Sequence, residues 1–474
     1  MSVIEGTWGV ADTAGAIRKG EISPRESVEA AIRRIESVDP RLNAVIWNRF
    51  DEALHEADTA PRDRPLSGVP VLLKDVALEG APFHHGSKLL AGLDWRFPVT
   101  DLFTERLCKA GAVVLGYTNI PEFLSAPTTE SRLSGACRNP WNPDHSAGGS
   151  SGGAGAAVAA LMVPAAQSSD GGGSSRIPAS ANGLFTIKTC RGRTPLAPSS
   201  ATWLDISNSK SFETRSVRDF ALLLDVVAGV DGRETLGALP PSRPFSQEPG
   251  APVGKLRIGY TATGGGSSAP SHPESQKALK GAIALLQSLG HEVEEAAPDT
   301  FLSEESFAII RGYWPSKIAL QAAVVEKRLG RALSADDLEP ATYAMLEFAR
   351  QQSTAEFVAA LDHIREFTAR SLTWWKTYDL LLTPTTGSPP PLLGAITGAD
   401  PKSRAAATLW GRFTPYANIT GQPAASLPLH WTADGLPVGV QLIADSYRED
   451  LLLRIAAQLE EAQPWAGHVP PIHG

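Results

Sequence analysis

The sequence predicts an α/β fold, in which short β-strands alternate along the chain with amphipathic helices. Apolar runs such as VPVLLK (69–74) and GAVVLGY (111–117) are typical of buried strands. The segment DLFTERLCKA (101–110) between them has helical periodicity. With 42% hydrophobic and 20% charged residues, the 474-residue chain can bury a large core and is unlike a disordered protein. No linker rich in proline, serine or charge divides it, so we expect one large soluble domain.

The first helix is predicted after Ser23, which is placed to cap it, with Glu26 completing a capping box. Its apolar face comprises Val28, Ile32 and Ile35. We expect this helix to end before Pro40, because a helix-interior proline lacks the N–H donor. Further helices are predicted within 101–110, 216–229, 275–290, much of 300–375 and 448–462. Further strands are predicted within 255–260, 291–296, 378–385 and 435–444.

Charge and cysteine content narrow the partners and the compartment. The net charge is −8 and no run of lysine and arginine occurs, so neither nucleic acid nor an anionic membrane is expected as a partner. The three cysteines form no CxxC pair, the first ten residues do not resemble a signal peptide, and no run of about 18 apolar residues is present. We therefore expect a cytoplasmic protein that acts on a small molecule.

A stretch rich in glycine and serine, SAGGSSGGAGAAVAA (146–160), has the composition of a linker or of a close-packed turn. A similar stretch, TGGGSSAP (263–270), is followed by proline and is interpreted as a loop. The first stretch differs because its glycines lead into an alanine-rich helix former, so the loop brings N–H groups and Ser150 to a helix N-terminus. Such a place suits an anion or a nucleophilic hydroxyl.

A second glycine run, SSDGGGSSRIPAS (168–180), favours chemistry over a mere turn. Consecutive glycines before a serine let backbone N–H groups converge on one point, as an oxyanion hole requires. Ser174 is therefore a candidate nucleophile, and it needs a base. Lys74 ends the apolar run 69–74, where burial can keep an amine neutral, although a lone lysine there is also typical of a structural salt bridge. None of the histidines lies in these motifs: His84 and His85 fall in a polar loop, and His145 is an isolated candidate.

Three segments together, VLLKD, GGSSGGAGAAVAA and SSDGGGSSRIPASANGLFTIK, resemble the amidase signature family. The similarity covers nearly the whole chain and is greatest to its 6-aminohexanoate-cyclic-dimer hydrolase and aryl-acylamidase members. The resemblance implies that Ser174 is the nucleophile, Ser150 a bridging serine next to a cis peptide, and Lys74 the base. We expect the Lys74 amine within about 4 Å of the Ser150 hydroxyl, as a proton relay requires.

The resemblance also implies the rest of the site and the architecture. The oxyanion hole would be formed by the N–H groups of Gly171, Gly172, Gly173 and Ser174, and the site would be supported by Asp170, Arg176 and Ser151. The fold would be a mixed, twisted central sheet flanked by helices on both faces. One amidase signature domain would span 1–474, with a helical segment at 1–60, the signature core at 62–240 and a variable substrate-pocket region at about 300–420.

The chain departs from the family pattern close to the predicted site. Family members usually have Gly-Thr-Asp-Thr where this chain has Ser168, Ser169, Asp170 and Gly171. Gly171 removes a side chain beside the oxyanion hole, which we expect to widen the acyl side of the site or loosen its loop. In addition, IKTCRGR replaces the commoner Lys-Pro-Thr form, and Ala147 replaces a frequent proline.

These features predict a serine hydrolase that cleaves the C–N bond of uncharged amides, anilides or carbamates through an acyl-enzyme, with urethanase and esterase activity as extensions. No metal or organic cofactor is expected, because no cluster of ligand spacing occurs. A homodimer is compatible with the sequence. The choice of substrate depends on the 196–215 loop and the 300–420 region. The chain has 11 tryptophans, and those in the 300–420 region suggest an apolar wall of the substrate pocket, although aromatic residues also build cores. Two alternatives stay open: a glutamyl-tRNA amidotransferase A-type subunit, although SRIPAS lacks the glutamine expected there, and a non-catalytic binding protein.

Overall fold

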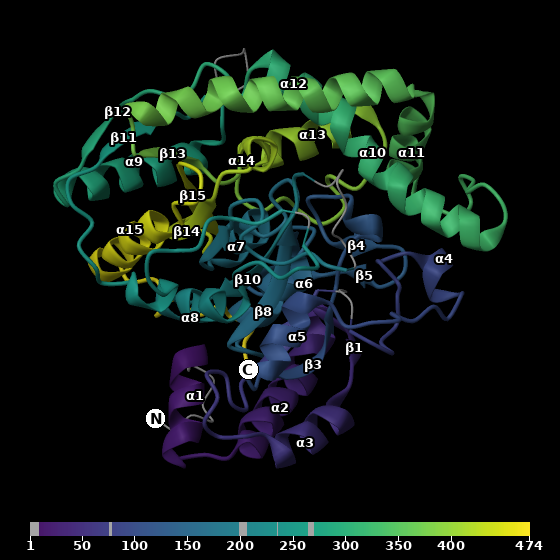
Figure 1. Cartoon of the computed structure of the whole chain (residues 1–474), viewed down its shortest axis with the longest axis vertical. Coiled ribbons are helices and arrows are strands. Elements are labelled where there is room, and N and C mark those ends of the chain that lie inside the picture. The colour runs from purple at the N-terminus through teal and green to yellow at the C-terminus, as the bar shows by residue number, and fades with distance from the viewer. Residues whose placement is uncertain (1–8, 75–77, 199–205, 235, 264–269) are drawn as a thin grey trace.

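The computed structural model describes residues 9–74, 78–198, 206–234, 236–263 and 270–474. It confirms the α/β class, with a mixed sheet in two parts (Figure 1). The five-stranded part has the order β1-β3-β2-β8-β10 and the six-stranded part the order β12-β11-β13-β15-β14-β9. The strands are β1 Val45–Asn48, β2 Pro70–Leu73, β3 Val113–Thr118, β8 Ala165–Asp170, β9 Thr186–Lys188, β10 Ser209–Thr214, β11 Arg257–Tyr260, β12 Glu292–Glu295, β13 Leu380–Pro384, β14 Ala424–Trp431 and β15 Pro437–Ala444. Short strands β4 Glu130–Ser131, β5 Gly135–Ala136, β6 Arg138–Asn139 and β7 Asn142–Ser146 form two hairpins.

The two parts of the sheet adjoin where β9 and β10 meet. Phe185 and Thr214 exchange backbone hydrogen bonds of 2.9 and 3.1 Å there. Strand β2 runs parallel to β3 and β8, whereas β1 and β10 are antiparallel to their neighbours. In the second part β11 is parallel to β12 and β13, and the remaining pairs are antiparallel. The parallel β2–β8 pair brings the ends of these two strands to the same edge, where Lys74 and the glycine run follow.

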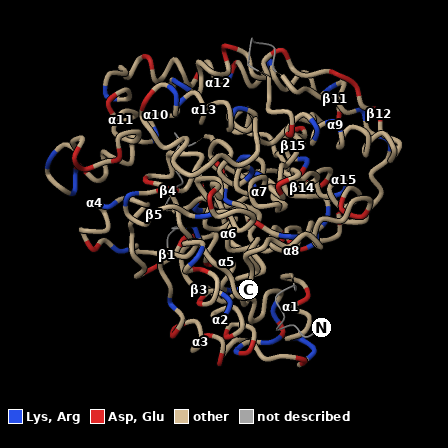
Figure 2. The backbone as a smooth tube through the Cα atoms, turned by 180° about the vertical axis from the view of Figure 1, so that it is seen from behind, with Lys and Arg blue, Asp and Glu red and all other residues tan. Residues whose placement is uncertain are grey.

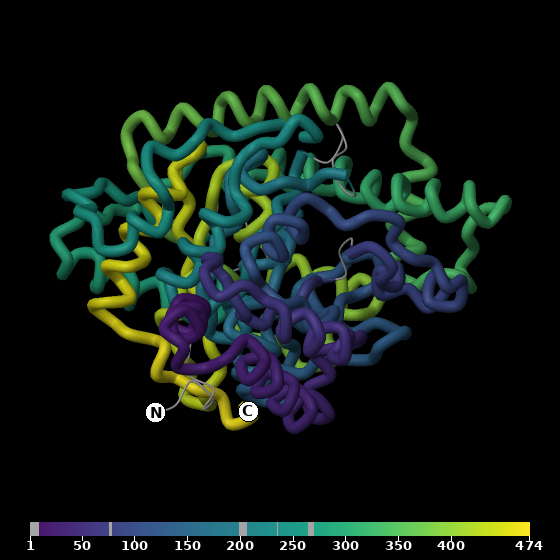
Figure 3. The backbone as a smooth tube through the Cα atoms, turned by 60° about the horizontal axis from the view of Figure 1, so that its bottom comes forward, coloured from purple at the N-terminus to yellow at the C-terminus, as the bar shows by residue number. Residues whose placement is uncertain are grey.

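The helices surround this sheet. They are α1 Val10–Lys19, α2 Pro24–Leu42, α3 Phe50–Thr59, α4 Lys88–Ala91, α5 Leu102–Lys109, α6 Gly152–Ala159, α7 Arg176–Asn182, α8 Val217–Val227, α9 Pro273–Ser288, α10 Glu304–Leu329, α11 Pro340–Gln351, α12 Thr354–Leu372, α13 Pro401–Gly411, α14 Pro415–Thr420 and α15 Glu449–Ala462. Within the described ranges, short 3₁₀ helices occupy Glu122–Leu124, Phe245–Gln247 and Thr373–Lys376. Helices α10–α12, which we call the helical lobe, lie at the opposite end of the molecule from α1–α3 (Figures 1 and 3). No helix in the described part of the chain is long and apolar enough to cross a membrane.

Strand β15 shows how both faces of the sheet are covered. Val438, Val440 and Leu442 lie in one apolar cluster with residues of α9 and α15. Gln441 points the other way and accepts a hydrogen bond from Arg176 of α7. The period of two along a strand thus places apolar packing on one face and the polar support of the glycine run on the other. Lysine, arginine and acidic residues are interspersed along the tube of the backbone (Figure 2).

The first predicted helix is correct at its start and wrong at its end. The Ser23 side chain accepts from the Glu26 N–H, and the Glu26 carboxylate accepts from the Ser23 N–H, so the capping box is present. The helix continues past Pro40 to Leu42 and ends at Asn43, which has left-handed geometry. Proline removes one hydrogen bond here without stopping the helix, because Val38 and Leu42 on either side are buried in the core.

Most predicted strands and helices are present, and several further elements were not predicted. Among these, β8 is the most important, because it leads directly into the glycine run. The predicted loop at 263–270 lies almost wholly outside the described residues, as does part of the 196–215 loop.

Candidate active site

Lys74 follows β2 directly and is only 1% exposed. Its Nζ lies 2.9 Å from the Ser150 Oγ, so the structure brings together two residues that are far apart in the sequence. Ser150 is equally buried, and the peptide bond between Gly149 and Ser150 is cis. The lysine amine and this serine hydroxyl are therefore in direct hydrogen-bond contact.

Two residues of β8 form hydrogen bonds with Lys74, and neither role was predicted from the sequence. The Nζ donates to Ser169 Oγ at 2.9 Å and to Ser169 O at 3.2 Å, and the Lys74 N–H donates to Gln167 Oε1 at 2.9 Å. Gln167 and Ser169 alternate along β8, so their side chains share one face of the strand. An alternation of polar residues directly before the glycine run was the signal that could have found them.

The two serine motifs are adjacent in space. Ser151 is the N-cap residue of α6, and its N–H donates to the Ser174 carbonyl at 3.2 Å. The Ser151 hydroxyl lies 3.4 Å from both the carbonyl and the N–H of Ser169. Ser151 thus links the Ser150 segment, the end of β8 and the Ser174 segment. Ser174 itself is half-buried, so its side chain borders space that a substrate can reach.

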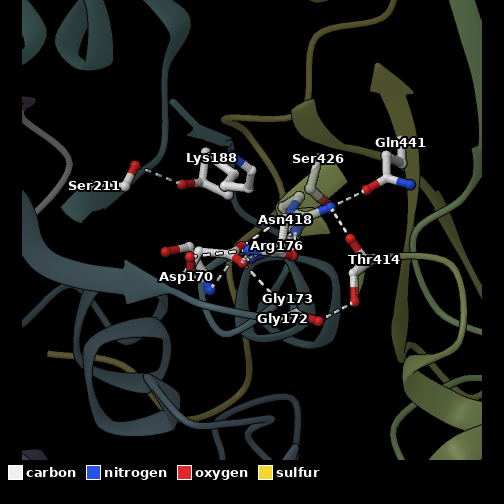
Figure 4. Close-up of polar contacts among 12 residues, drawn as sticks. Asp170, Gly172, Gly173, Arg176, Lys188, Ser211, Thr414, Asn418, Ser426 and Gln441 are labelled. Carbon is white, nitrogen blue, oxygen red and sulfur yellow. Dashed lines mark hydrogen bonds and ion pairs between the residues drawn. The ribbon is translucent and has the colours of Figure 1, made fainter. Parts of the chain in front are cut away.

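Asp170 and Arg176 form a fully buried ion pair behind the glycine run, with Nε and Oδ2 2.9 Å apart (Figure 4). Arg176 also donates to Asn418 Oδ1 at 2.6 Å and Gln441 Oε1 at 2.5 Å. Burial alone would raise the pKa of Asp170, but the Arg176 charge and the hydrogen bonds from Arg176 and Asn418 hold it well below its usual value. Asp170 therefore remains a carboxylate and shapes the loop that follows it.

The Asp170 carboxylate takes up one N–H group that was expected in the oxyanion hole. The Gly173 N–H donates to Asp170 Oδ1 at 2.6 Å, so the prediction that all four N–H groups face the substrate is wrong at Gly173. Among the described residues, the N–H groups of Gly171, Gly172 and Ser174 have no hydrogen-bond partner. These three remain as candidate oxyanion donors.

Close contacts explain two of the glycines. A Cβ on Gly173, whose φ is +128°, would lie 2.1 Å from Thr414 Oγ1, which in turn donates to the Gly172 carbonyl at 2.7 Å. A Cβ on Gly172 would lie 2.3 Å from Cη2 of Trp314. Neither position can carry a side chain without moving its neighbour. Trp314 and Thr414 both lie in the 300–420 region that was expected to form the substrate pocket, although neither residue was named as a site residue.

Gly171 was expected to leave extra room beside the oxyanion hole. A Cβ built there would lie 3.0 Å from Lys317 Nζ and 3.7 Å from Trp314 Cη2. The missing side chain therefore makes space for two residues of α10 that approach the loop. The gap is filled in part by the protein itself.

The histidines take other roles. His145 Nδ1 lies 2.7 Å from the Pro390 carbonyl. His85 packs against the rings of Phe83 and Phe97, and burial together with the nearby Lys74 charge lowers its pKa to about 4. No three His, Cys, Asp or Glu side chains within the described ranges gather as a metal site would require.

Comparison with known proteins identifies the family of this chain. The family model described as Amidase matches residues 26–453. The chain belongs to the amidase signature family. It is 39% identical to the 6-aminohexanoate-cyclic-dimer hydrolase of Paenarthrobacter ureafaciens, over 97% of this chain and 95% of that one. A solved structure of 6-aminohexanoate cyclic dimer hydrolase complexed with substrate superimposes with a TM-score of 0.94 at 36% identity, covering 99% of this chain and 100% of that one. A bacterial aryl acylamidase superimposes with a TM-score of 0.87 at 28% identity, covering 97% and 99%. This family member is thus an amide hydrolase by relationship.

Proposed function

We propose that the protein hydrolyses uncharged linear or cyclic amides, anilides and carbamates through an acyl-enzyme on Ser174, with Ser150 and Lys74 as its proton relay. The observation that carries this proposal is the 2.9 Å contact between Lys74 Nζ and Ser150 Oγ in a buried site. A serine hydroxyl becomes nucleophilic when a base takes its proton, and a buried amine in contact with a second hydroxyl is such a base.

The hydrogen bonds of Lys74 with Ser150 and Ser169 can form in both protonation states of the amine. A protonated amine can donate to Ser150 Oγ, Ser169 Oγ and Ser169 O. A neutral amine can donate to the two Ser169 oxygens and accept the Ser150 O–H. Only the direction of the Lys74–Ser150 hydrogen bond changes between these states. The relay can therefore take a proton and return it without rearranging the site.

In the proposed reaction, the Ser174 hydroxyl attacks the substrate carbonyl carbon while its proton passes to Ser150 and the Ser150 proton passes to Lys74. The developing oxyanion is stabilised by N–H groups of Gly171, Gly172 and Ser174. Lys74 then returns the proton through Ser150 to the leaving nitrogen, and the C–N bond breaks. Water hydrolyses the acyl-enzyme by the same relay in reverse, which restores Ser174 and releases the acid.

The choice of substrate rests on two supports. The relatives named above act on a cyclic amide and on aryl amides, according to their names. An indole ring, that of Trp314, lies against the glycine run. An apolar wall favours bulky or aromatic substrates over small polar ones such as acetamide and glutamine. Carbamates have the same kind of carbonyl and leaving nitrogen, so the same steps apply to them.

The test is to assay the purified chain alone against the 6-aminohexanoate cyclic dimer, aryl amides, aryl carbamates, aryl esters, acetamide and glutamine. We expect turnover without any partner protein, with kcat/KM larger for the bulky amides and carbamates than for acetamide and glutamine. The opposite ranking would contradict the substrate proposal. Glutamine hydrolysis only with partner subunits would favour the amidotransferase alternative, and binding without turnover would favour a non-catalytic protein.

A further inference from the structure

We propose that Trp314 is a specificity-determining residue, which selects substrates with a flat apolar group on the acyl side of the scissile carbonyl. This inference rests on the acyl-enzyme chemistry proposed above. It adds the residue that distinguishes one acyl group from another, and it places that residue in α10, outside the predicted signature core.

The first support is the contact between Trp314 and the catalytic loop. A Cβ on Gly172 would lie 2.3 Å from Cη2, 2.9 Å from Cζ2 and 3.0 Å from Cζ3 of the indole. Three atoms of the six-membered ring thus face this glycine. Because the Gly172 N–H is one of the remaining oxyanion donors, any group attached to the bound carbonyl on this side meets the indole.

The second support is accessibility. Trp314, Gly171, Gly172 and Ser174 are all half-buried, whereas Gly173 and Arg176 behind the loop are buried. The indole is therefore partly accessible next to Gly171 and Gly172, which are themselves partly accessible, rather than enclosed in the core. A tryptophan whose ring only supported the fold would be expected among the fully buried residues, as Trp410 is.

The third support is that neighbouring residues fix the position of Trp314. The Tyr313 hydroxyl accepts from the Ile206 N–H at 3.1 Å. Lys317 Nζ lies 5.1 Å from the Trp314 ring centroid and donates to Ser207 Oγ at 3.0 Å. These contacts tie α10 to the segment that begins at Ile206, on either side of Trp314. A wall held in this way can discriminate between shapes, because it does not move aside at low cost.

Proton transfer decides which part of the substrate meets this wall. The leaving nitrogen must lie within reach of the Ser150 hydroxyl, which returns its proton. The acyl group then leaves the carbonyl carbon on the side away from Ser150, next to the oxygen that the Gly171 and Gly172 N–H groups hold. Trp314 is thus placed to contact the acyl group, and flat apolar acyl groups gain most from an indole face or edge.

The experiment compares 4-nitroanilides of acetic, hexanoic and benzoic acid, which share one leaving group, in the wild type and in Trp314→Ala and Trp314→Phe. We expect Trp314→Ala to lower kcat/KM for the benzoyl substrate about 10- to 100-fold relative to the acetyl substrate. Losses of this size are typical when an apolar substrate group loses the apolar side chain that it packs against. Trp314→Phe, which keeps a flat ring, should stay within about 3-fold of the wild type in that ratio. Phe348→Ala, an aromatic residue of the same helical lobe that is 52% exposed, is the matched control and should change nothing.

A second series keeps the benzoyl group and varies the amine, and the effect of Trp314→Ala should be the same across it. An equal loss for all acyl groups, an unchanged ratio, or a loss that follows the amine would overturn the inference. Labelling of Ser174 by a fluorophosphonate, which needs no amide substrate, separates the two proposals. If the wild type is not labelled and turns over no amide, the proposed function fails. If it is labelled and active but the acyl ratio ignores Trp314, only this inference fails.

Discussion

The hydrogen bond between Lys74 and Ser169 predicts that Ser169 affects catalysis, although it is neither the nucleophile nor the bridging serine. Ser169 offers two acceptors to the amine, its hydroxyl at 2.9 Å and its carbonyl at 3.2 Å. Ser169→Ala removes the hydroxyl and keeps the carbonyl. When Lys74 takes the proton during attack, the ammonium then lacks the hydrogen bond to this hydroxyl, in a site that is 1% exposed.

The size of the effect follows from this lost hydrogen bond. A hydrogen bond to a charged group contributes about 1.5–3 kcal/mol, which corresponds to about a 10- to 100-fold lower kcat if the bond is needed in the transition state. The ammonium form is also disfavoured before reaction. The acidic limb of kcat/KM should therefore move to lower pH in Ser169→Ala, even as the maximum falls.

The assay is the pH dependence of kcat and kcat/KM on one aryl amide. Ser169→Thr keeps the hydroxyl and should stay close to the wild type. Ser211→Ala is the control, because it removes another buried hydroxyl, one that donates to the Ile187 carbonyl at 2.6 Å, away from Lys74. If Ser169→Ala keeps the wild-type kcat, or loses activity with no shift of the acidic limb, the Ser169 hydroxyl does not stabilise the Lys74 ammonium during the reaction.

Three further predictions concern the surroundings of the relay. Burial raises the pKa of Glu213 well above its usual value, against the opposing effect of the Ser168 hydroxyl, so the folded protein keeps a proton that the unfolded chain loses above about pH 4.3. From that pH up to the raised pKa of Glu213 in the folded protein, the free energy of unfolding should fall with rising pH, by at most about 1.4 kcal/mol per pH unit from this group. Urea denaturation from pH 5 upward should show that Glu213→Gln removes that fall; a parallel dependence in both proteins would contradict it. Asp170→Asn leaves the buried Arg176 charge unpaired, so it should lower the free energy of unfolding by about 3–5 kcal/mol in the same urea titration and also lower the activity. A change below about 1 kcal/mol would count against a structural role for this ion pair. Gly171→Thr should displace the Lys317 ammonium, the flexible end of a side chain, and raise the acetyl-to-benzoyl ratio of kcat/KM without unfolding the protein; a lowered ratio would show that the site has more room there than the contacts imply.

Local sequence patterns were sufficient to predict the helices and strands that begin with a side-chain cap or have apolar periodicity. The capping box at Ser23 and the strand before Lys74 are of this kind. The end of the first helix could not be read in the same way, because burial of Leu42 outweighs the cost of Pro40. Tertiary packing decided that boundary.

Strand β8 was missed because its sequence, AAQSSD, has no apolar alternation, although all six residues are buried. Its polar side chains are satisfied by partners that come from other parts of the fold. Gln167 binds the Lys74 backbone, Ser168 contacts the Ser175 hydroxyl at 2.8 Å, and Asp170 pairs with Arg176. A strand whose burial depends on such partners lacks the apolar pattern by which the other strands were predicted.

The motifs predicted that Lys74 and Ser150 lie together, and the structure places them 2.9 Å apart. For the wall of the site, the sequence indicated the 300–420 region but not the individual side chains. Lys74, Ser150 and Ser174 stand in long motifs, so the sequence alone indicated that they belong together. Thr414 and Trp314 contact the glycine run from segments more than a hundred residues away. The occupation of the Gly173 N–H by Asp170 depends on loop geometry that spacing does not specify.

The central claim is that Lys74 activates Ser174 through Ser150, and the rate of covalent labelling tests it most directly. The rate of reaction with a fluorophosphonate is measured across pH by intact mass and the labelled peptide is mapped, in the wild type, Ser174→Ala, Lys74→Ala and His145→Ala. We expect label on Ser174 alone, none in Ser174→Ala, a wild-type rate that rises with pH as Lys74 loses its proton, and a loss of about 10²- to 10⁴-fold at neutral pH in Lys74→Ala, with His145→Ala unchanged. Labelling of Lys74→Ala at the wild-type rate, with loss in His145→Ala, would contradict it and assign the base to the histidine.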